Sequence, residues 1–172
     1  MPGVVSASGS EEVVDLLRCL ADDEDRDVRA AAVRALGVRL NTASDMAQRS
    51  QVIQVIDTAL TDEAIVALAA IEALRGLGGS NVERVLQILD RPEPEVVLEA
   101  VRCLGAATEP SFLESLLPLV SHPDWTVRAE TIQVLADCSV AKAVPALLRR
   151  LETEQDDFVR DAMLRALDRL GG

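Results

Sequence analysis

A valine followed eight residues later by a leucine recurs five times along the chain, and this repetition constrains the fold more than any other feature. The valines are Val28, Val66, Val96, Val127 and Val159, and the leucines are Leu36, Leu74, Leu104, Leu135 and Leu167. Successive leucines are 38, 30, 31 and 32 residues apart. A period of this length predicts a repeat array in which each unit packs mainly on its neighbours. We call each valine the anchor of its repeat and count positions from it.

Each repeat contains two amphipathic segments with helical spacing, one before the anchor and one that begins near it. The first segments include EEVVDLLRCLA, QVIQVIDTAL and NVERVLQILD. The chain is 49% apolar, but it has only 2% aromatic residues, so its core must be built from Leu, Val, Ile and Ala. These residues favour helices over a β-sandwich or barrel. The sequence therefore predicts five helix–turn–helix units.

The second helix of each repeat alternates small and large residues on the side expected to be buried. Position 7 has Ala35, Ala73, Cys103, Val134 and Ala166, whereas position 8 is always leucine. Small residues facing large ones let stacked helices approach closely. The alanine-rich segment DVRAAAVRALG, residues 27–37, is therefore interpreted as a packing surface for the next repeat.

Charged residues recur at two positions around the anchors. Arginines follow three anchors, at Arg29, Arg128 and Arg160, and an acid precedes every anchor by three residues, including Asp25, Asp124 and Asp156. An isolated buried charge is costly, so we expect each arginine to reach an acid of the adjoining repeat or of its own turn. The acids are expected to cap the second helices. All six are assigned a structural role between repeats.

The segments DRDVRAAAVRALG, DWTVRAETIQVLA and DDFVRDAMLRALD resemble the HEAT repeat, in particular the short variety named after bilin lyases. Repeats two and three depart from the pattern, with Ala67 and Val97 at the arginine position. The resemblance implies an all-α, right-handed solenoid of five antiparallel helix pairs, with the second helices lining a concave side. It specifies the fold strongly and the function weakly.

These observations set the predicted boundaries. Residues 1–9 are expected to be a disordered lead, and residues 10–172 one repeat domain. The repeats are expected at 10–40, 44–79, 80–108, 109–138 and 139–172. The insertion at residues 41–50 either extends the following helix or forms a flexible loop.

Recognition residues are expected on the concave side, at positions 2, 3 and 6 after each anchor. Leu68 and Leu98 occupy a side of their helices that is expected to be exposed to solvent. They form either an apolar contact patch for a partner or a pair that the superhelix half-buries. The predicted partner-binding residues are Arg34, Leu68, Glu72, Leu98, Glu99, Arg102, Glu130, Gln133 and Arg165.

The net charge of −12 disfavours nucleic acid and anionic membranes as partners, because the few basic residues are scattered. A protein partner is expected. Many acids crowd into the turns before the anchors, which is interpreted first as dipole compensation and solubility, with attraction of a partner that has a basic surface as the alternative. The chain has three cysteines and no CxxC pair. These cysteines, Cys19, Cys103 and Cys138, are interpreted as reduced packing residues of a cytoplasmic protein. A monomer is expected.

No catalytic residue, metal site or cofactor is predicted. The single histidine, His122, rules out the repeated His-Glu pairs of iron-holding HEAT-like hydroxylases, and a HEAT-like DNA glycosylase would need a basic face. The predicted function is a non-catalytic scaffold or adaptor that binds a protein on its concave side. The alternative is a bilin lyase-like or phycobilisome-related subunit, disfavoured by the scarcity of aromatic residues for a chromophore pocket.

Overall fold

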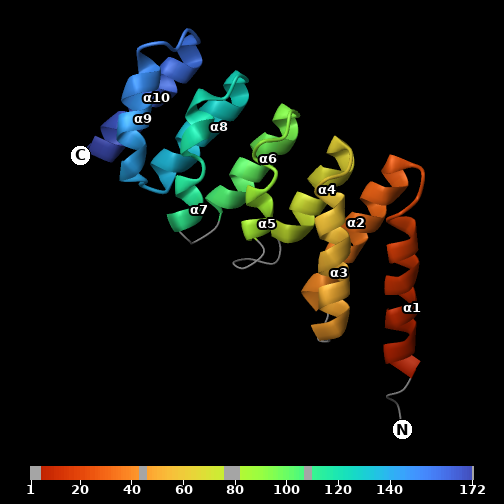
Figure 1. Ribbon diagram of the computed structural model, residues 1–172. Helices are drawn as coiled ribbons and strands as arrows, with labels where there is room; N and C mark the ends of the chain where they lie inside the picture. Colours follow the sequence, from red (N-terminus) through yellow and green to blue (C-terminus); the bar gives the residue numbers. More distant parts are fainter. Residues whose placement is uncertain (1–4, 43–45, 76–81, 107–109, 172) are drawn as a thin grey trace. The chain divides into compact units, whose positions relative to one another are not determined.

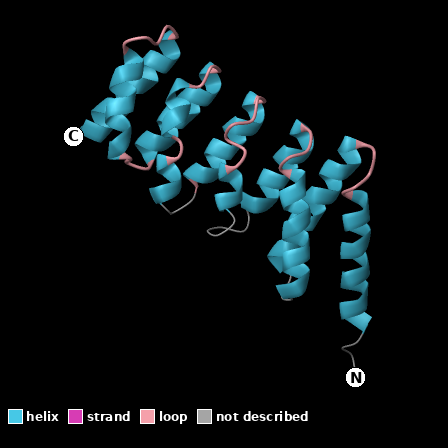
Figure 2. Cartoon of the chain, in the orientation of Figure 1, coloured by secondary structure: helices cyan, strands magenta, loops and turns pink. Residues whose placement is uncertain are grey.

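The computed structural model describes residues 5–42, 46–75, 82–106 and 110–171. Every regular element in these ranges is a helix, so the predicted all-α class is confirmed (Figure 2). The chain divides into two compact units, Met1–Asn81 and Val82–Gly172, each of which is described by itself. The division falls close to the predicted boundary between repeats two and three, and the single domain over residues 10–172 stays a prediction.

Unit 1 contains two helix pairs. Helix α1 (Val5–Leu20) pairs with α2 (Arg26–Thr42), and α3 (Met46–Ala59) pairs with α4 (Ala64–Arg75). The two second helices, α2 and α4, pack along one another and form the most extensive contact in the unit (Figure 1). Residues 5–9, for which disorder was expected, lie within α1, and residues 1–4 lie outside the described residues.

The insertion at residues 41–50 contributes to helices at both of its described ends. Helix α2 continues to Thr42, and α3 already begins at Met46, four residues before Ser50. The Ser50 hydroxyl donates a hydrogen bond to the Met46 carbonyl from inside α3, at 3.0 Å. Residues 43–45 lie outside the described residues.

Unit 2 contains three helix pairs. Helix α5 (Val82–Leu86) precedes α6 (Pro94–Gly105), and α7 (Pro110–Glu114) with the 3₁₀ helix η2 (Leu117–Ser121) precedes α8 (Trp125–Asp137). The third pair consists of η3 (Ala141–Ala143) with α9 (Val144–Leu151), followed by α10 (Asp157–Gly171). Helix α8 packs between α6 and α10, so the second helices of this unit form one layer (Figure 1).

Glycines permit the closest approach between second helices in both units. A Cβ added to Gly37 would lie 2.5 Å from the Cβ of Ala73, and one added to Gly105 would lie 2.7 Å from Val134 Cγ1. Each glycine is at position 9, and its neighbour is at position 7 of the next repeat. Position 9 therefore faces the following repeat and position 7 faces the preceding one, which fixes the direction of stacking.

Aspartates cap three of the second helices through their side chains. Asp124 accepts hydrogen bonds from the backbone N–H groups of Thr126 and Val127, at 2.8 and 3.3 Å. Asp25 and Asp156 accept equivalent bonds at the starts of α2 and α10. At the start of α6, the Glu93 side chain makes no capping bond. It pairs with Arg91 instead, at 2.9 Å, and this partner holds the pKa of Glu93 below its usual value.

Candidate functional site

The second helices of unit 2 form a groove of about 350 Å³. Its lining comes from three successive repeats and consists of Leu98 and Arg102 of α6, Trp125, Thr126, Ala129, Glu130 and Gln133 of α8, and Phe158, Ala162 and Arg165 of α10. We call this the aromatic groove. It brings together five of the predicted partner-binding residues, namely Leu98, Arg102, Glu130, Gln133 and Arg165.

Two aromatic side chains form one end of the aromatic groove. Trp125 and Phe158 stand at the starts of α8 and α10, and their rings meet edge to face with centroids 5.8 Å apart. They remain 47% and 59% exposed. The edge-to-face geometry is favourable for aromatic rings, so the pair presents a preorganised apolar surface to solvent.

The floor of the aromatic groove is small and apolar. Leu98, Ala129 and Ala162 are half-buried, and two of the three are alanines. Short side chains leave the depression beside the aromatic pair unfilled. An apolar side chain from outside could therefore reach the floor and be shielded from water.

Ion pairs on exposed side chains form the polar border of the aromatic groove. Arg102 bridges from α6 to Glu130 of α8 at 3.1 Å, and Arg165 pairs with Asp161 of α10 at 2.6 Å. The hydrogen bond that Arg102 donates to Glu130 raises the pKa of Arg102. Glu99 lies outside the lining and also contacts Arg102, at 3.7 Å. Exposed pairs of this kind add little stability, so their main effect is to hold the border side chains in place.

The remaining predicted residues lie in unit 1. Arg34 of α2 and Glu72 of α4 form an exposed pair at 3.2 Å, and Leu68 is half-buried. Leu68 and Leu98 belong to different units, so the apolar patch predicted from these two leucines stays a prediction.

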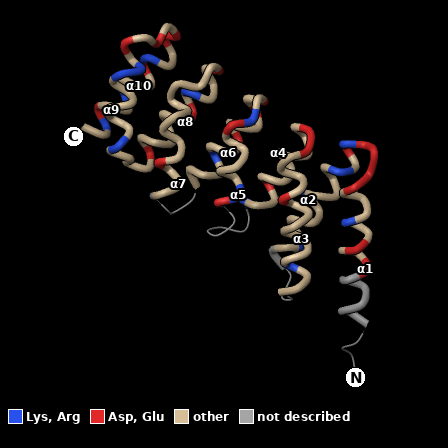
Figure 3. Tube along the Cα trace, in the orientation of Figure 1, with Lys and Arg blue, Asp and Glu red and all other residues tan. Residues whose placement is uncertain are grey.

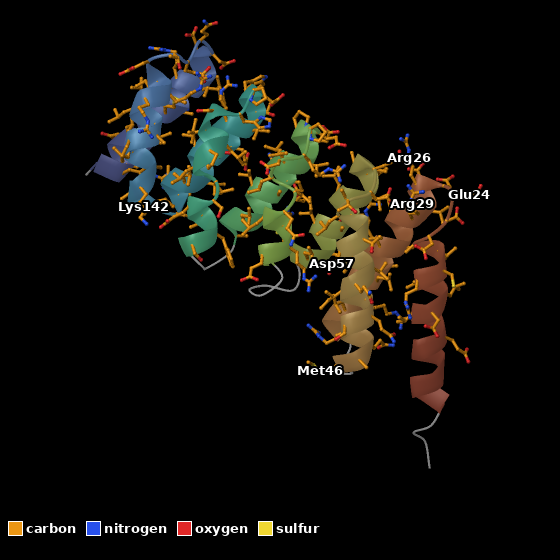
Figure 4. All side chains as sticks on the ribbon, in the orientation of Figure 1. Glu24, Arg26, Arg29, Met46, Asp57 and Lys142 are labelled. Atoms are coloured by element: carbon orange, nitrogen blue, oxygen red, sulfur yellow. The ribbon has the colours of Figure 1, made fainter. Side chains whose placement is uncertain are left out.

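Two of the arginines at position 1, Arg29 and Arg128, hold neighbouring repeats together. In unit 1, Arg29 donates from Nε and Nη2 to both carboxylate oxygens of Asp62 in the next repeat, each at 2.8 Å, and from Nη1 to the carbonyls of Asp23 and Glu24 in its own turn. Figure 4 shows Arg29 and Glu24 together at the α1–α2 turn. The hydrogen bond to Asp62 raises the pKa of Arg29.

In unit 2, Arg128 makes the same kind of contact with Glu154, at 2.8 and 2.9 Å. The two side chains are 7% and 1% exposed. Burial alone would raise the pKa of Glu154, but hydrogen bonds from the Asp156 N–H and Arg128, together with the charges of Arg128 and Arg150, lower it overall. Glu154 is one of the acids in the turns before the anchors. The structure buries it because it neutralises Arg128.

Acidic residues still concentrate in the turns, as Figure 3 shows for the α1–α2 turn. His122 lies in the turn before α8, where its Nδ1 accepts a hydrogen bond from the Asp124 N–H at 3.1 Å. Cys103 is buried and Cys19 is exposed, and desolvation raises the pKa of the half-buried Cys138 thiol. Within the described residues, no group of three or more His, Cys, Asp or Glu side chains is arranged to hold a metal ion. The described helices also include none long and apolar enough to span a membrane.

A family model for HEAT repeats matches residues 82–168, which span the three helix pairs of unit 2. The chain belongs to the HEAT-repeat family. The sequence resembles the short lyase-type repeat, and one of the similar structures is a lyase: the complex of CpcE and CpcF of phycocyanin lyase from Nostoc sp. PCC7120. That structure is 19% identical with a TM-score of 0.62, and the match covers 91% of this chain and 64% of that chain.

Two further structures share the fold. Human deoxyhypusine hydroxylase in complex with glycerol is 20% identical with a TM-score of 0.59, and the match covers 93% of this chain and 62% of that chain. A designed armadillo repeat protein in complex with the peptide (KR)4 is 18% identical with a TM-score of 0.58, covering 97% and 84%. At these identities the likeness shows the fold alone. No curated protein matches the sequence.

The sequence analysis missed Trp125 and Phe158 as candidate site residues. A signal was present, because Trp125 and Phe158 are two of only three aromatic residues in the chain and both lie within two residues of an anchor. Their proximity depends on the stacking of α8 against α10, which the periodicity alone did not define.

Proposed function

We propose that this HEAT-repeat protein is a non-catalytic scaffold that holds a segment of a partner protein in the aromatic groove. The observation that carries the proposal is the pair of half-exposed rings beside a floor of small side chains. Aromatic residues are enriched where protein interfaces concentrate their binding energy. In a chain with so few aromatics, two in contact on one surface favour recognition over packing.

The segment is proposed to insert an apolar side chain beside Trp125 and Phe158. Leu98, Ala129 and Ala162 would cover this side chain from below, while the paired border residues exclude water around it. The amide of Gln133 offers hydrogen bonds to the backbone of the segment. An uncharged inserted side chain suits the border of the groove, because Arg102 and Arg165 already have carboxylate partners.

In the partner segment, basic residues are proposed to flank the inserted apolar side chain. The exposed Asp157 precedes Phe158 directly at the start of α10, and the exposed Glu95 lies at the start of α6, which packs against α8. The net charge of −12 adds a long-range attraction for cationic segments. A lysine or arginine can also stack on the exposed indole. The proposed partner is therefore a cytoplasmic protein with an apolar residue between basic ones.

The single tryptophan allows a direct test, because Trp125 is both part of the groove and the only indole in the chain. The native protein would be titrated with a synthetic peptide that has a central leucine flanked by lysines, while tryptophan emission is recorded. We expect a saturable change in emission, and a loss of about tenfold or more in affinity for Phe158→Ala. Met46→Ala is the control, since Met46 is also exposed but belongs to α3 of unit 1, outside the groove.

Two altered peptides separate the contributions of shape and charge. Replacing the central leucine of the peptide by serine should abolish the change in tryptophan emission. Replacing its lysines by glutamates should weaken binding most at low salt. Equal binding of all three peptides, or an equal loss in both protein variants, would contradict the proposal. A red-shifted, enhanced absorption band on mixing with a free bilin, lost in Phe158→Ala, would support the lyase-like alternative instead.

A further inference from the structure

The position-1 arginines have a forked pattern of hydrogen bonds that defines how one repeat receives the next. Nη1 of Arg128 donates to the carbonyls of His122 and Pro123 in its own turn, at 2.9 Å each. Nε and Nη2 point the other way, to Glu154 of the following repeat. Arg29 divides its bonds in the same way. In each of these two guanidinium groups, Nη1 therefore bonds the arginine's own repeat, and Nε and Nη2 bond the repeat that packs on it.

Arg160 has only the first half of this pattern. Its Nη1 donates to the carbonyls of Leu151 and Glu154, at 3.1 and 3.0 Å. Its Nε and Nη2 have no partner within the described residues, and the side chain is exposed. The guanidinium is held in the receiving orientation, so a carboxylate could bind it with little loss of side-chain entropy.

Apolar residues near Arg160 occupy positions after the anchor that are buried in the preceding repeat but more exposed here. Leu164 is 53% exposed, whereas Ile132 at the same position of the preceding repeat is fully buried, in the helix on which α10 packs. Leu167 lies one helical turn from Leu164 on the same side of α10. On α9, Leu148 is 52% exposed on the flank opposite Arg149 and Thr153, which line a groove against η2. We call Leu148, Arg160, Leu164 and Leu167 the receiving face.

A complementary surface is present on α2 and the α1–α2 turn of unit 1. Val28, Ala31, Ala35 and Val38 lie along one side of α2, and their small size matches what α10 presents to α8 at positions 3 and 7. Ala31 and Val38 are exposed. This side lies roughly opposite to the buried Val33.

Asp23 supplies the carboxylate. It precedes its anchor by five residues, as Glu154 does, and it accepts a hydrogen bond from the N–H of Asp25 at 2.9 Å. Glu154 accepts the equivalent bond from Asp156 at 3.0 Å. The α1–α2 turn therefore presents an acid at the place where Glu154 meets Arg128.

We propose that copies of this chain associate head to tail, with the α1–α2 pair of one copy packing on the receiving face of another and Asp23 pairing with Arg160. The contact is heterologous, because each copy uses two different surfaces. It continues the stacking that joins α8 to α10, with small residues of α2 seating Leu164 and Leu167. This differs from the monomer expected from the sequence and does not involve the aromatic groove.

Two blocking variants test the proposal by sedimentation velocity over a range of concentrations. Leu164→Asp removes the receiving face and leaves α1–α2 intact, whereas Ala31→Arg does the reverse. Both sites are exposed, so both variants should keep the native helical spectrum and melting curve. The native chain should associate increasingly with concentration, and each variant alone should remain monomeric. An equimolar mixture of the two variants should form a discrete dimer, because one complementary pair of faces survives.

Two milder substitutions measure the polar part of the contact. Arg160→Gln should weaken association about fivefold, the size of one partly exposed ion pair. Asp168→Ala should strengthen it, because Asp168 occupies the position at which the buried Ala136 contacts the next repeat. Arg149→Ala, on the opposite flank of α9, is the unaffected control. A native chain that stays monomeric at all concentrations would overturn the proposal, and so would an Ala31→Arg variant that still self-associates.

Discussion

Removing the Arg128 side chain should destabilise the protein without altering its recognition surface. In the substitution Arg128→Met, the apolar stem is retained but four hydrogen bonds from the guanidinium disappear. Glu154 is only 1% exposed and remains buried. It keeps Arg150 at 3.0 Å and the N–H groups of Gln155 and Asp156 as partners.

The expected loss in unfolding free energy is about 3 kcal/mol. Breaking a buried ion pair by removing one partner costs about 3–5 kcal/mol, because the remaining charge is left uncompensated. The lower end of this range applies here, since Arg150 still neutralises Glu154. The carbonyls of His122 and Pro123 lose a donor but lie in a turn that water can reach, so they add little.

Urea denaturation followed by Trp125 fluorescence measures this loss, because Trp125 begins the helix that carries Arg128. Arg160→Met is the matched control, as Arg160 holds the same position but has no carboxylate partner within the described residues. Its cost should stay below about 1 kcal/mol. Equal costs for both variants would refute the reasoning. Peptide affinity below the transition should be nearly unchanged in Arg128→Met, since Arg128 does not line the aromatic groove.

Three other predictions concern the core and its charges. Because the pKa of Glu154 is lowered from 4.5, its contribution is complete above that value and is lost as the pH falls toward the lowered pKa, so acid titrations should show a steeper loss of stability for the native chain than for Glu154→Gln. Gly37→Val should lower the melting temperature, with a cost of about 1–3 kcal/mol, because its Cβ would overlap Ala73. Thr131→Val should leave the urea midpoint unchanged or raise it, because the buried Thr131 hydroxyl has no hydrogen-bond partner in the part of the chain that the structure describes.

The helix pairs could be predicted from the sequence because their determinants are local and periodic. An anchor valine and a leucine eight residues later place one side of each second helix in the core, and Gly37 and Gly105 mark the closest contacts. Serine is a common helix-capping residue, but two serines that precede apolar segments do not mark helix starts here. Ser50 lies inside α3, and Ser139 adopts a left-handed backbone conformation with φ of 55°.

The candidate site depends on contacts between repeats, and these were less accessible to sequence reasoning. The periodicity placed Arg102 and Glu130 on one side of their helices, but it could not show that they pair across α6 and α8. It also could not identify Glu154 as the partner of Arg128, because Arg29 uses an acid one position later, Asp62. The aromatic pair depended on the same stacking geometry and was missed.

Residue-resolved NMR titration of the native chain with the leucine-centred, lysine-flanked peptide tests the central claim most directly. Binding in the aromatic groove predicts that the largest saturable shifts fall on the Trp125 indole, the Phe158 ring and the Ala129 and Ala162 methyl groups. Shifts concentrated on Ala146 and Arg149, in the groove on the other side of α9, would contradict it. So would a peptide that binds without moving the Trp125 indole resonance.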